Sequence, residues 1–223
     1  MKNKKCIILL SGGLDSTTTL YYLLHKKFEP LCIIFDYGQR HKKEINYAKK
    51  IAKNLNLKYY IVKIDLPWKG SSLIDKKQKI PVHKNLKFEN NKIPSTYVPA
   101  RNMIFLSYAV SLAEVTKINY IFYGAHQIDF SGYPDCRKEF IYSFQKMVNV
   151  STKLALSGKK IKIIAPFINY DKSQIIKLAV KLNVPLHLTW SCYKGDKKPC
   201  GVCDACKYRK AGFEKLGLKD PLL

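Results

Sequence analysis

Four cysteines near the end of the sequence have the spacing of metal ligands. The chain contains seven cysteines, and the pattern Cys-x7-Cys-x2-Cys-x2-Cys gathers four of them: Cys192, Cys200, Cys203 and Cys206. Four thiolates can surround Zn²⁺ tetrahedrally at about 2.3 Å per sulfur, and they leave no position open for water. The pattern therefore predicts one structural zinc ion that holds the end of the chain, with iron–sulfur ligation and free or disulfide-bonded cysteines as alternatives.

A glycine-rich string near the start of the chain has the composition of an anion-binding loop. Residues 11–18 read Ser-Gly-Gly-Leu-Asp-Ser-Thr-Thr and lie between an apolar run and a helical pattern. Adjacent glycines let backbone N–H groups approach phosphate oxygens, and a helix N-terminus attracts anions. The string lacks both the lysine of a Walker A loop and the G-x-G-x-x-G spacing. It predicts a phosphate-binding loop of another kind, with a plain Ser/Gly turn as the alternative.

Alternating strand and helix patterns surround these two motifs. Apolar or β-rich runs predict strands at residues 6–10, 31–35, 59–64, 120–123 and 161–164. Helical periodicity predicts helices at residues 17–25, 43–54, 101–116, 138–156 and 172–182. Crossovers of this length require parallel strands. We therefore expect an α/β fold with a doubly wound, mainly parallel sheet in residues 1–185, and a small zinc-bound segment with four cysteine ligands in residues 186–223.

Residues 66–99 interrupt this alternation. They combine Pro, Gly and Asn with many lysines, and they are too long for an ordinary connection between two elements. The segment predicts a mobile lid or a surface insertion.

Composition sets limits on the class of protein. The 223 residues are 47% hydrophobic and 25% charged, which is ordinary for a folded globular chain. The net charge of +24 comes from 40 Lys and Arg against 16 Asp and Glu, and only four of these cations are arginines. Proteins that recognise bases and phosphates favour arginine. We therefore interpret most of the lysines as compositional drift, with a nucleic-acid-binding surface as the alternative. No apolar run approaches the roughly 20 residues of a membrane span, so we expect a cytoplasmic protein without a membrane partner.

The glycine-rich string, placed after a first strand, resembles the pyrophosphate loop of the N-type ATP pyrophosphatases, the PP-loop superfamily. The resemblance implies an adenine nucleotide alpha-hydrolase-like fold that splits ATP between its α and β phosphates and passes AMP to an acceptor oxygen. It also implies that ATP with Mg²⁺ is bound at Leu10, Ser11, Gly12, Gly13, Leu14, Asp15, Ser16, Thr17, Thr18 and Phe35. Lys172 opens a later helix in the way that a phosphate-contacting lysine does in such enzymes.

Three further strings narrow the resemblance: residues 35–41 (Phe-Asp-Tyr-Gly-Gln-Arg-His), 97–102 (Tyr-Val-Pro-Ala-Arg-Asn) and 129–137 (Asp-Phe-Ser-Gly-Tyr-Pro-Asp-Cys-Arg). Together with Leu-Thr-Trp-Ser-Cys-Tyr at 188–193, they are similar to the 7-cyano-7-deazaguanine (preQ0) synthase family of queuosine biosynthesis. The resemblance runs from about Leu10 to Phe213, with Thr19 in place of an expected cysteine and a divergent lysine-rich stretch. It implies conversion of 7-carboxy-7-deazaguanine and ammonium to the nitrile, with adenylation first of the carboxylate and then of the amide. A homodimer is typical of the family.

The resemblance also implies which residues act on the substrate. Arginines in the three strings, Arg40, Arg101 and Arg137, are candidate clamps for phosphate and carboxylate groups. A guanine-like edge presents two N–H donors to a carboxylate, for which Asp135 and Asp129 are candidates, while Phe130 or Tyr133 would stack on the ring. The candidate catalytic residues are Asp15, Ser16, Lys172, Arg101, Asp135 and Arg137. His41 and His126 lie in motif loops and are candidates for proton transfer.

Two other functions remain open at this point. In one, the same ATP loop serves a tRNA-modifying enzyme of the thiolation or lysidine type, and the basic surface binds RNA. In the other, the cysteine-rich segment is a zinc ribbon on a non-enzymatic nucleic-acid-binding module. The second leaves the string at residues 11–18 without a role.

Overall fold

The sheet is fully parallel. The computed structural model describes residues 4–82, 93–126 and 132–222. Within these residues the strands are β1 (Lys4–Leu9), β2 (Phe28–Asp36), β3 (Tyr59–Lys63), β4 (Tyr120–Phe122) and β5 (Lys162–Ile164). They pair in parallel in the order β3-β2-β1-β4-β5. The order reverses between β1 and β4, so a crevice is expected at the carboxyl ends of these two strands.

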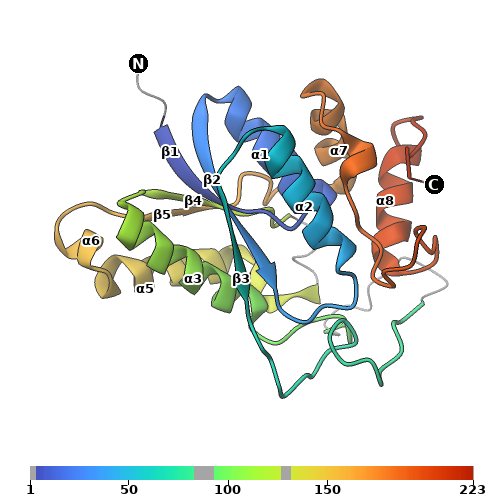
Figure 1. The fold of residues 1–223 in the computed structure, drawn as a ribbon, viewed down its shortest axis with the longest axis horizontal. Coiled ribbons are helices and arrows are strands. Elements are labelled where there is room, and N and C mark those ends of the chain that lie inside the picture. Colours follow the sequence, from blue (N-terminus) through green and yellow to red (C-terminus); the bar gives the residue numbers. More distant parts are fainter. Residues whose placement is uncertain (1–3, 83–92, 127–131, 223) are drawn as a thin grey trace.

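Helices cover both faces of the sheet (Figure 1). They are α1 (Leu14–His25), α2 (Lys43–Asn54), α3 (Arg101–Thr116), α5 (Lys138–Ser151), α6 (Lys153–Leu156), α7 (Lys172–Lys181) and α8 (Asp204–Glu214). Helices α1 and α2 pack on one face, and α3 and α5 pack on the other. The last helix, α8, packs against α7, and Phe213 of α8 shares a buried cluster with Leu14 of α1. The doubly wound α/β prediction is confirmed, whereas the domain boundary at residue 185 stays a prediction.

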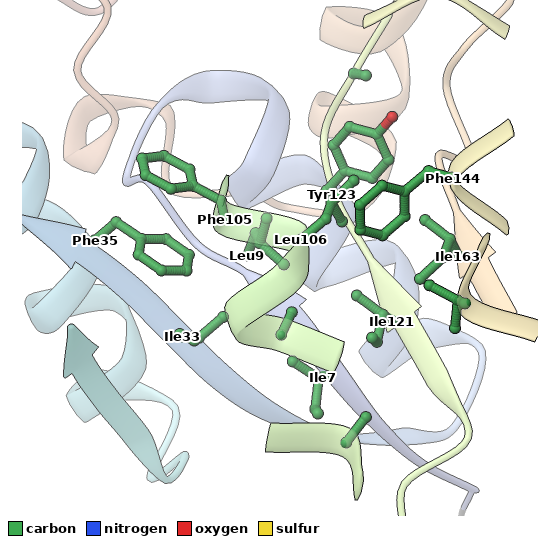
Figure 2. Packing of buried hydrophobic residues seen from close by; sticks show 14 of the residues in the cluster. Ile7, Leu9, Ile33, Phe35, Phe105, Leu106, Ile121, Tyr123, Phe144 and Ile163 are labelled. Carbon is green, nitrogen blue, oxygen red and sulfur yellow. The ribbon is translucent and has the colours of Figure 1, made fainter. Parts of the chain in front are cut away.

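Alternation along the strands builds two cores. On β1, Ile7 and Leu9 face α3 and α5, whereas Cys6 and Ile8 face α1 and α2. Figure 2 shows the first core, in which Leu106 of α3 lies over Ile7 and Leu9. Because successive side chains of a strand point to opposite faces, an apolar run with helices on both sides is buried throughout. This burial fixes the register of the strands whose ends carry the site.

Two helix boundaries differ from the prediction. Helix α1 begins at Leu14 rather than at residue 17, so the glycine-rich string supplies its first turn. The helix predicted for residues 138–156 is interrupted at Thr152, whose backbone is extended (φ −117°, ψ 144°). The Thr152 hydroxyl donates to the Val148 carbonyl (2.9 Å) and accepts from the Ala155 amide (3.3 Å), so it ends α5 and caps α6. Periodicity alone does not register such a break.

The segment at residues 66–99 is more than a surface insertion. Leu66, Leu73 and Val98 are buried in the core on the α3 face. The Arg40 guanidinium donates to the carbonyls of Asp75 and Gln78 and so ties the segment to the end of β2. Residues 83–92 lie outside the described part of the chain. Residues 66–82 and 93–99 are therefore anchored in the core, and Leu73 lines the crevice, whereas the mobility expected of the segment stays a prediction.

The first turn of α7 predicts a measurable pH effect. The Asp171 carboxylate accepts from the Gln174 amide (2.8 Å), and the Gln174 side chain accepts from the Asp171 amide (2.8 Å), which makes a capping box. Burial alone would raise the pKa of Asp171, but hydrogen bonds from Lys215, Ser173 and Gln174 lower it to about 2. Asp171→Ala should therefore lower the free energy of unfolding at neutral pH by about 1 kcal/mol.

The sign of this pH dependence follows from the lowered pKa. Because the pKa of Asp171 is lower in the folded protein than in the unfolded chain, where it is near 3.9, the ionised carboxylate stabilises the fold fully at pH values above about 3.9. This stabilisation is lost as the pH falls toward about 2. In urea unfolding, the difference in the free energy of unfolding between wild type and Asp171→Ala should therefore shrink as the pH is lowered from about 4 to about 2. A difference that stays constant would instead indicate lost packing.

Candidate active site

The crevice between β1 and β4 opens into a cavity of about 260 Å³. One end is formed by the glycine-rich loop and the start of α1, and the other by aromatic side chains around Arg101. The polar residues that line it are Ser11, Asp15, Ser16, Gln39, His41, Glu44, Arg101, Asn102, His126, Lys172, Ser191 and Arg209. Phe35, Tyr37, Phe105, Tyr123, Tyr133, Tyr193 and Tyr208 provide aromatic walls. The cavity therefore joins a polar end to an aromatic one.

The conformation of the glycine-rich loop requires glycine. Gly12 has a φ of +80°, and a Cβ there would collide with the Glu44 carbonyl oxygen and would lie 2.6 Å from the Ala48 amide nitrogen. The loop thus lies directly against the first turns of α2. Gly13 is the N-cap residue of α1 and has no side chain to cap the first amides, and these are the groups that bind anions at helix N-termini.

Glycine is also required where β4 meets the loop. A Cβ at Gly124 would lie 2.9 Å from the Ser16 amide nitrogen. Ser16 itself is held by Ser11, with 2.9 Å between the two hydroxyl oxygens. The loop is therefore fixed from α2, from β4 and from within.

Asp15, His126 and Lys172 form a charged cluster at the polar end. The Lys172 ammonium lies 2.8 Å from both Asp15 carboxylate oxygens and 2.9 Å from His126 Nε2. His126 Nε2 is also 3.3 Å from Asp15. Burial would raise the pKa of Asp15, but Lys172 and His126 outweigh it and hold this pKa below its usual range. The cluster brings together two residues predicted from distant motifs, and it places a cation beside the start of α1.

Arg101 is the cation at the other end of the cavity. Its guanidinium donates to the Tyr37 hydroxyl at 3.0 Å. Burial alone would lower the pKa of Arg101, but the nearby Tyr37, Tyr133 and Asp135 raise it, so the group stays charged. The preceding residue, Ala100, has a φ of 55°, an unusual conformation for a residue with a Cβ, and such conformations cluster at functional sites. Arg101 can therefore attract a carboxylate.

Phe35 forms part of the aromatic wall. Its ring stacks on Phe105 with 4.1 Å between centroids and 2° between planes. Figure 2 shows the two rings between β2 and α3. A flat π-surface of this kind suits a heteroaromatic ring.

Several predicted site residues do not line the cavity. Asp135 is buried, and its carboxylate accepts from the Asn102 amide at 2.8 Å, so it anchors the start of α3. Burial also raises the pKa of Asp135. Arg137 is exposed at the N-cap of α5, and Thr17 and Thr18 are fully buried in α1. Arg40 binds the carbonyls described above, and Asp129 and Phe130 lie outside the described residues. The roles assigned to these residues stay predictions.

The four cysteines of the predicted metal site come together. The sulfur atoms of Cys192, Cys200, Cys203 and Cys206 all lie within 4.8 Å of one another. The Cys200 amide donates to Cys192 Sγ (3.3 Å), and the Cys203 amide donates to Cys200 Sγ (3.4 Å). Four sulfurs bound at about 2.3 Å to one ion would be separated by slightly less than 4 Å, so the donor set fits a closed tetrahedral metal site. This four-cysteine cluster could hold a structural metal ion.

Trp190 connects this cluster to the glycine-rich loop. Its backbone amide donates to the Gly12 carbonyl (2.9 Å), and its indole N–H donates to the Cys192 carbonyl (2.9 Å). Arg209 fixes the same segment from α8, because it binds Asp220 with two hydrogen bonds (2.8 and 3.0 Å) and Thr189 with a third (2.7 Å). The C-terminal segment therefore forms one wall of the site.

Sequence reasoning missed Glu44 as a member of the site. Glu44 lines the cavity, and its carboxylate lies 3.1 Å from His41 Nε2. The spacing His-x-x-Glu at the start of a helix was the available signal, since residues three apart share a helix face. Tyr208 and Arg209 of α8 also line the cavity, but no helix was predicted beyond the cysteines.

The sheet order and the glycine-rich loop after β1 define a doubly wound α/β protein with a candidate anion-binding loop at the point where the strand order reverses. Solved structures with similar folds include an NMN synthetase from Francisella tularensis (TM-score 0.51, 18% identity, 97% of this chain and 79% of that one). Another is a 4-thiouridine synthetase in complex with RNA and ATP (TM-score 0.52, 16% identity, 95% of this chain and 53% of that one). At these identities the likeness concerns the fold alone.

Residues 5–217 match the family model of the queuosine biosynthesis protein QueC, and the chain belongs to this family. A 7-cyano-7-deazaguanine synthase from Acetivibrio thermocellus is 50% identical over 220 residues, which cover 98% of this chain and 97% of that protein. Synthases of the same name from Thermoplasma volcanium and Trichodesmium erythraeum are 48% and 46% identical, with 98% of this chain covered in both cases and 90% and 100% of those proteins. The family resemblance inferred from the motifs is confirmed.

Proposed function

We propose that this protein is an ATP-dependent enzyme that converts 7-carboxy-7-deazaguanine and ammonium into 7-cyano-7-deazaguanine. Relatives that span the full chain carry the name of this synthase. The observation that carries the proposal is the continuous cavity, which joins the uncapped start of α1 to Arg101 and an aromatic wall. Phosphates and a planar acid therefore share one space, as adenylation of a carboxylate requires.

The reaction needs two activations of the same carbon. In the first, a carboxylate oxygen attacks the α-phosphate of ATP, pyrophosphate leaves, and ammonia displaces AMP to form an amide. In the second, the amide oxygen attacks another ATP, and loss of AMP with the two N–H protons leaves the nitrile. Each half forms a P–O bond before it breaks a C–O bond, so one phosphate site can serve both.

The residues of the polar end stabilise the leaving pyrophosphate. Ser11, Gly13 and Ser16 line this end of the cavity, and the two hydroxyls and the backbone amides after Gly13 would bind the phosphates. Lys172 supplies positive charge there, and Asp15 together with Ser16 would hold the Mg²⁺ that accompanies ATP as substrate. Hydrogen-bond donors that are already in place where negative charge develops in the transition state usually make the largest electrostatic contribution to the rate.

The aromatic end holds the acceptor. Arg101 pairs with the carboxylate of the deazaguanine, and the Phe35 and Tyr133 rings offer surfaces for the two heterocycles. Asp135 lies behind Arg101 and accepts from the Asn102 amide, so any role it has toward the ring would be exerted through these two residues. We assign the ion of the four-cysteine cluster as Zn²⁺, since four thiolates favour it.

The partners of the reaction are small molecules. No helix in the described residues is long and apolar enough to cross a bilayer, and we place the enzyme in the cytoplasm. Homodimer formation is supported by exposed apolar side chains on three helices: Val115 of α3 (80% exposed), Val150 of α5 (76%) and Leu156 of α6 (82%). Sedimentation velocity would measure the oligomeric state.

One assay tests the function. The purified protein is incubated with ATP, ammonium and 7-carboxy-7-deazaguanine, and AMP and a nitrile product are measured by chromatography and mass spectrometry. AMP should form only when the carboxylate is present. AMP formation that depends on tRNA would support the RNA-modifying alternative, and absence of ATP turnover would overturn both.

A further inference from the structure

Glu44 and His41 form a second pair of contacting ionisable side chains in the cavity, in addition to the Asp15 cluster. Their side chains are 17% and 3% exposed, and Glu44 Oε2 lies 3.1 Å from His41 Nε2. Both residues line the cavity. Among the described residues, His41 Nδ1 is buried without a hydrogen-bond partner. No step described above uses this pair.

The position of Glu44 is unusual for a carboxylate. Its Oε1 atom lies 3.9 Å from where a Cβ on Gly13 would be, so it borders the loop that we assign to phosphates. It also faces Tyr37, whose pKa is raised by burial and further by the charge of Glu44. A phosphate bound at the loop and the Glu44 carboxylate would repel each other, so a cation between them would be stabilising.

Neighbouring lysines do not supply that cation. Lys43, next to Glu44, directs its ammonium away to the carbonyl of Lys197 (2.6 Å) and over the ring of Trp190 (4.3 Å). Lys172 is engaged by Asp15. Magnesium fits poorly, because it requires near-octahedral oxygen ligands, whereas one oxygen of Glu44 already faces an imidazole.

A small ammonium ion fits this position. One carboxylate oxygen can accept its hydrogen bond, and the rings of Tyr37 and Tyr193, which line the same cavity, offer the aromatic surfaces that attract compact cations. The proposed reaction requires ammonium, and an ammonium nitrogen has no lone pair until it loses a proton. The base must also lie beside the acyl adenylate, which forms between the phosphate loop and Arg101.

We propose that Glu44, held in place by His41, is the ammonium-binding subsite and accepts the proton that frees the nitrogen for attack. The proposal rests on the proposed function. The proton passes from ammonium to Glu44 Oε1, the nitrogen forms a C–N bond to the acyl carbon, and the C–O bond to AMP breaks. The nitrogen then releases one further proton, so aminolysis yields the amide, AMP and two protons. His41 is a positioning residue in this scheme.

Glu44→Gln tests the proposal, because it removes the charge and keeps the size. With ammonium, kcat/KM should fall about 100-fold, the lower end of what a positioned base contributes. With hydroxylamine, which is already neutral near pH 7, the variant should form the hydroxamate as fast as wild type. Glu139→Gln is the matched control, since Glu139 is exposed on α5 outside the cavity. It should leave both rates unchanged.

Adenylation is measured separately by exchange of labelled pyrophosphate into ATP in the presence of the carboxylate and without ammonium. Exchange in wild type and in Glu44→Gln should be equal. Three results with Glu44→Gln would each overturn the ammonium subsite. The first is an equal loss of kcat/KM with ammonium and with hydroxylamine, the second is a higher Mg²⁺ requirement, and the third is loss of pyrophosphate exchange in the variant while wild type retains it. Absence of exchange and product in wild type would instead overturn the proposed function.

Discussion

Replacing Lys172 by alanine should lower kcat for AMP formation by about 100- to 1,000-fold, the effect of removing one preorganised charged donor from a transition state. Lys172 lies at the start of α1, where its ammonium contacts Asp15 (2.8 Å) and His126 (2.9 Å). Without it, the negative charge of Asp15 would face the leaving pyrophosphate uncompensated. The measurement is AMP release at saturating ATP, carboxylate and ammonium.

Stability and catalysis can be separated at this cluster. Lys172→Ala leaves Asp15 without its main partner and should reduce the free energy of unfolding by about 2 kcal/mol. The pair replacement Asp15→Asn with Lys172→Met removes both charges, so it should recover most of that stability but none of the activity. If the pair replacement regained turnover, the role of Lys172 would be structural.

A matched lysine serves as the control. Lys215 makes an ion pair of the same length with Asp171 (2.8 Å), but its side chain is 66% exposed. Lys215→Ala should leave kcat unchanged, because solvent screens the pair and it lies outside the cavity. A loss equal to that of Lys172→Ala would mean that the first turn of α7, and not the Lys172 charge, supports catalysis.

Local sequence patterns predicted most elements of the fold, because the strands other than β3 are apolar runs followed by a helix of ordinary length. The strand order β3-β2-β1-β4-β5 was not predicted, because no local pattern says which strands pair. What the patterns could not supply were interruptions with a side-chain cause, such as Thr152, and the burial of Leu66, Leu73 and Val98 in a polar, lysine-rich segment. The core contacts of these residues join segments far apart in the chain, and hydrophobic periodicity cannot predict such contacts.

Some residues of the candidate site could likewise be predicted from local patterns, and others could not. Residues in contiguous strings, such as Ser11, Asp15 and Cys203, could be predicted because their spacing has a chemical meaning on its own. Asp135 and Arg137 were chosen for their chemistry within one string, yet a short 3-10 turn at Pro134–Cys136 points them away from the cavity or behind it. Glu44 enters the site because Gly12 allows α2 to touch the loop, and the His-x-x-Glu spacing alone does not predict this packing.

Removing the metal from the four-cysteine cluster should weaken ATP binding as well as the fold. Structural zinc contributes on the order of 10 kcal/mol to small domains that bind it, so its loss should release the segment from Thr189 to α8. That segment holds the loop through the Trp190 amide and the Gly12 carbonyl (2.9 Å). Cys203→Ser, or treatment with a strong chelator, should therefore raise the Kd for ATP about tenfold or more, which corresponds to one lost hydrogen bond.

Tryptophan fluorescence distinguishes this coupling from general unfolding. The chain has two tryptophans, of which Trp68 is 66% exposed and Trp190 is 2% exposed. In a Trp68→Phe background the emission reports on Trp190 alone, and it should shift to longer wavelength when the metal is removed while the far-ultraviolet circular dichroism of the sheet persists. Cys32→Ala, which removes a buried thiol of β2 outside the cluster, should bind metal and ATP as wild type does. A metal-free protein with exposed Trp190 and unchanged affinity for ATP would contradict the coupling, because the loop would then be held by α2 and Gly124 alone.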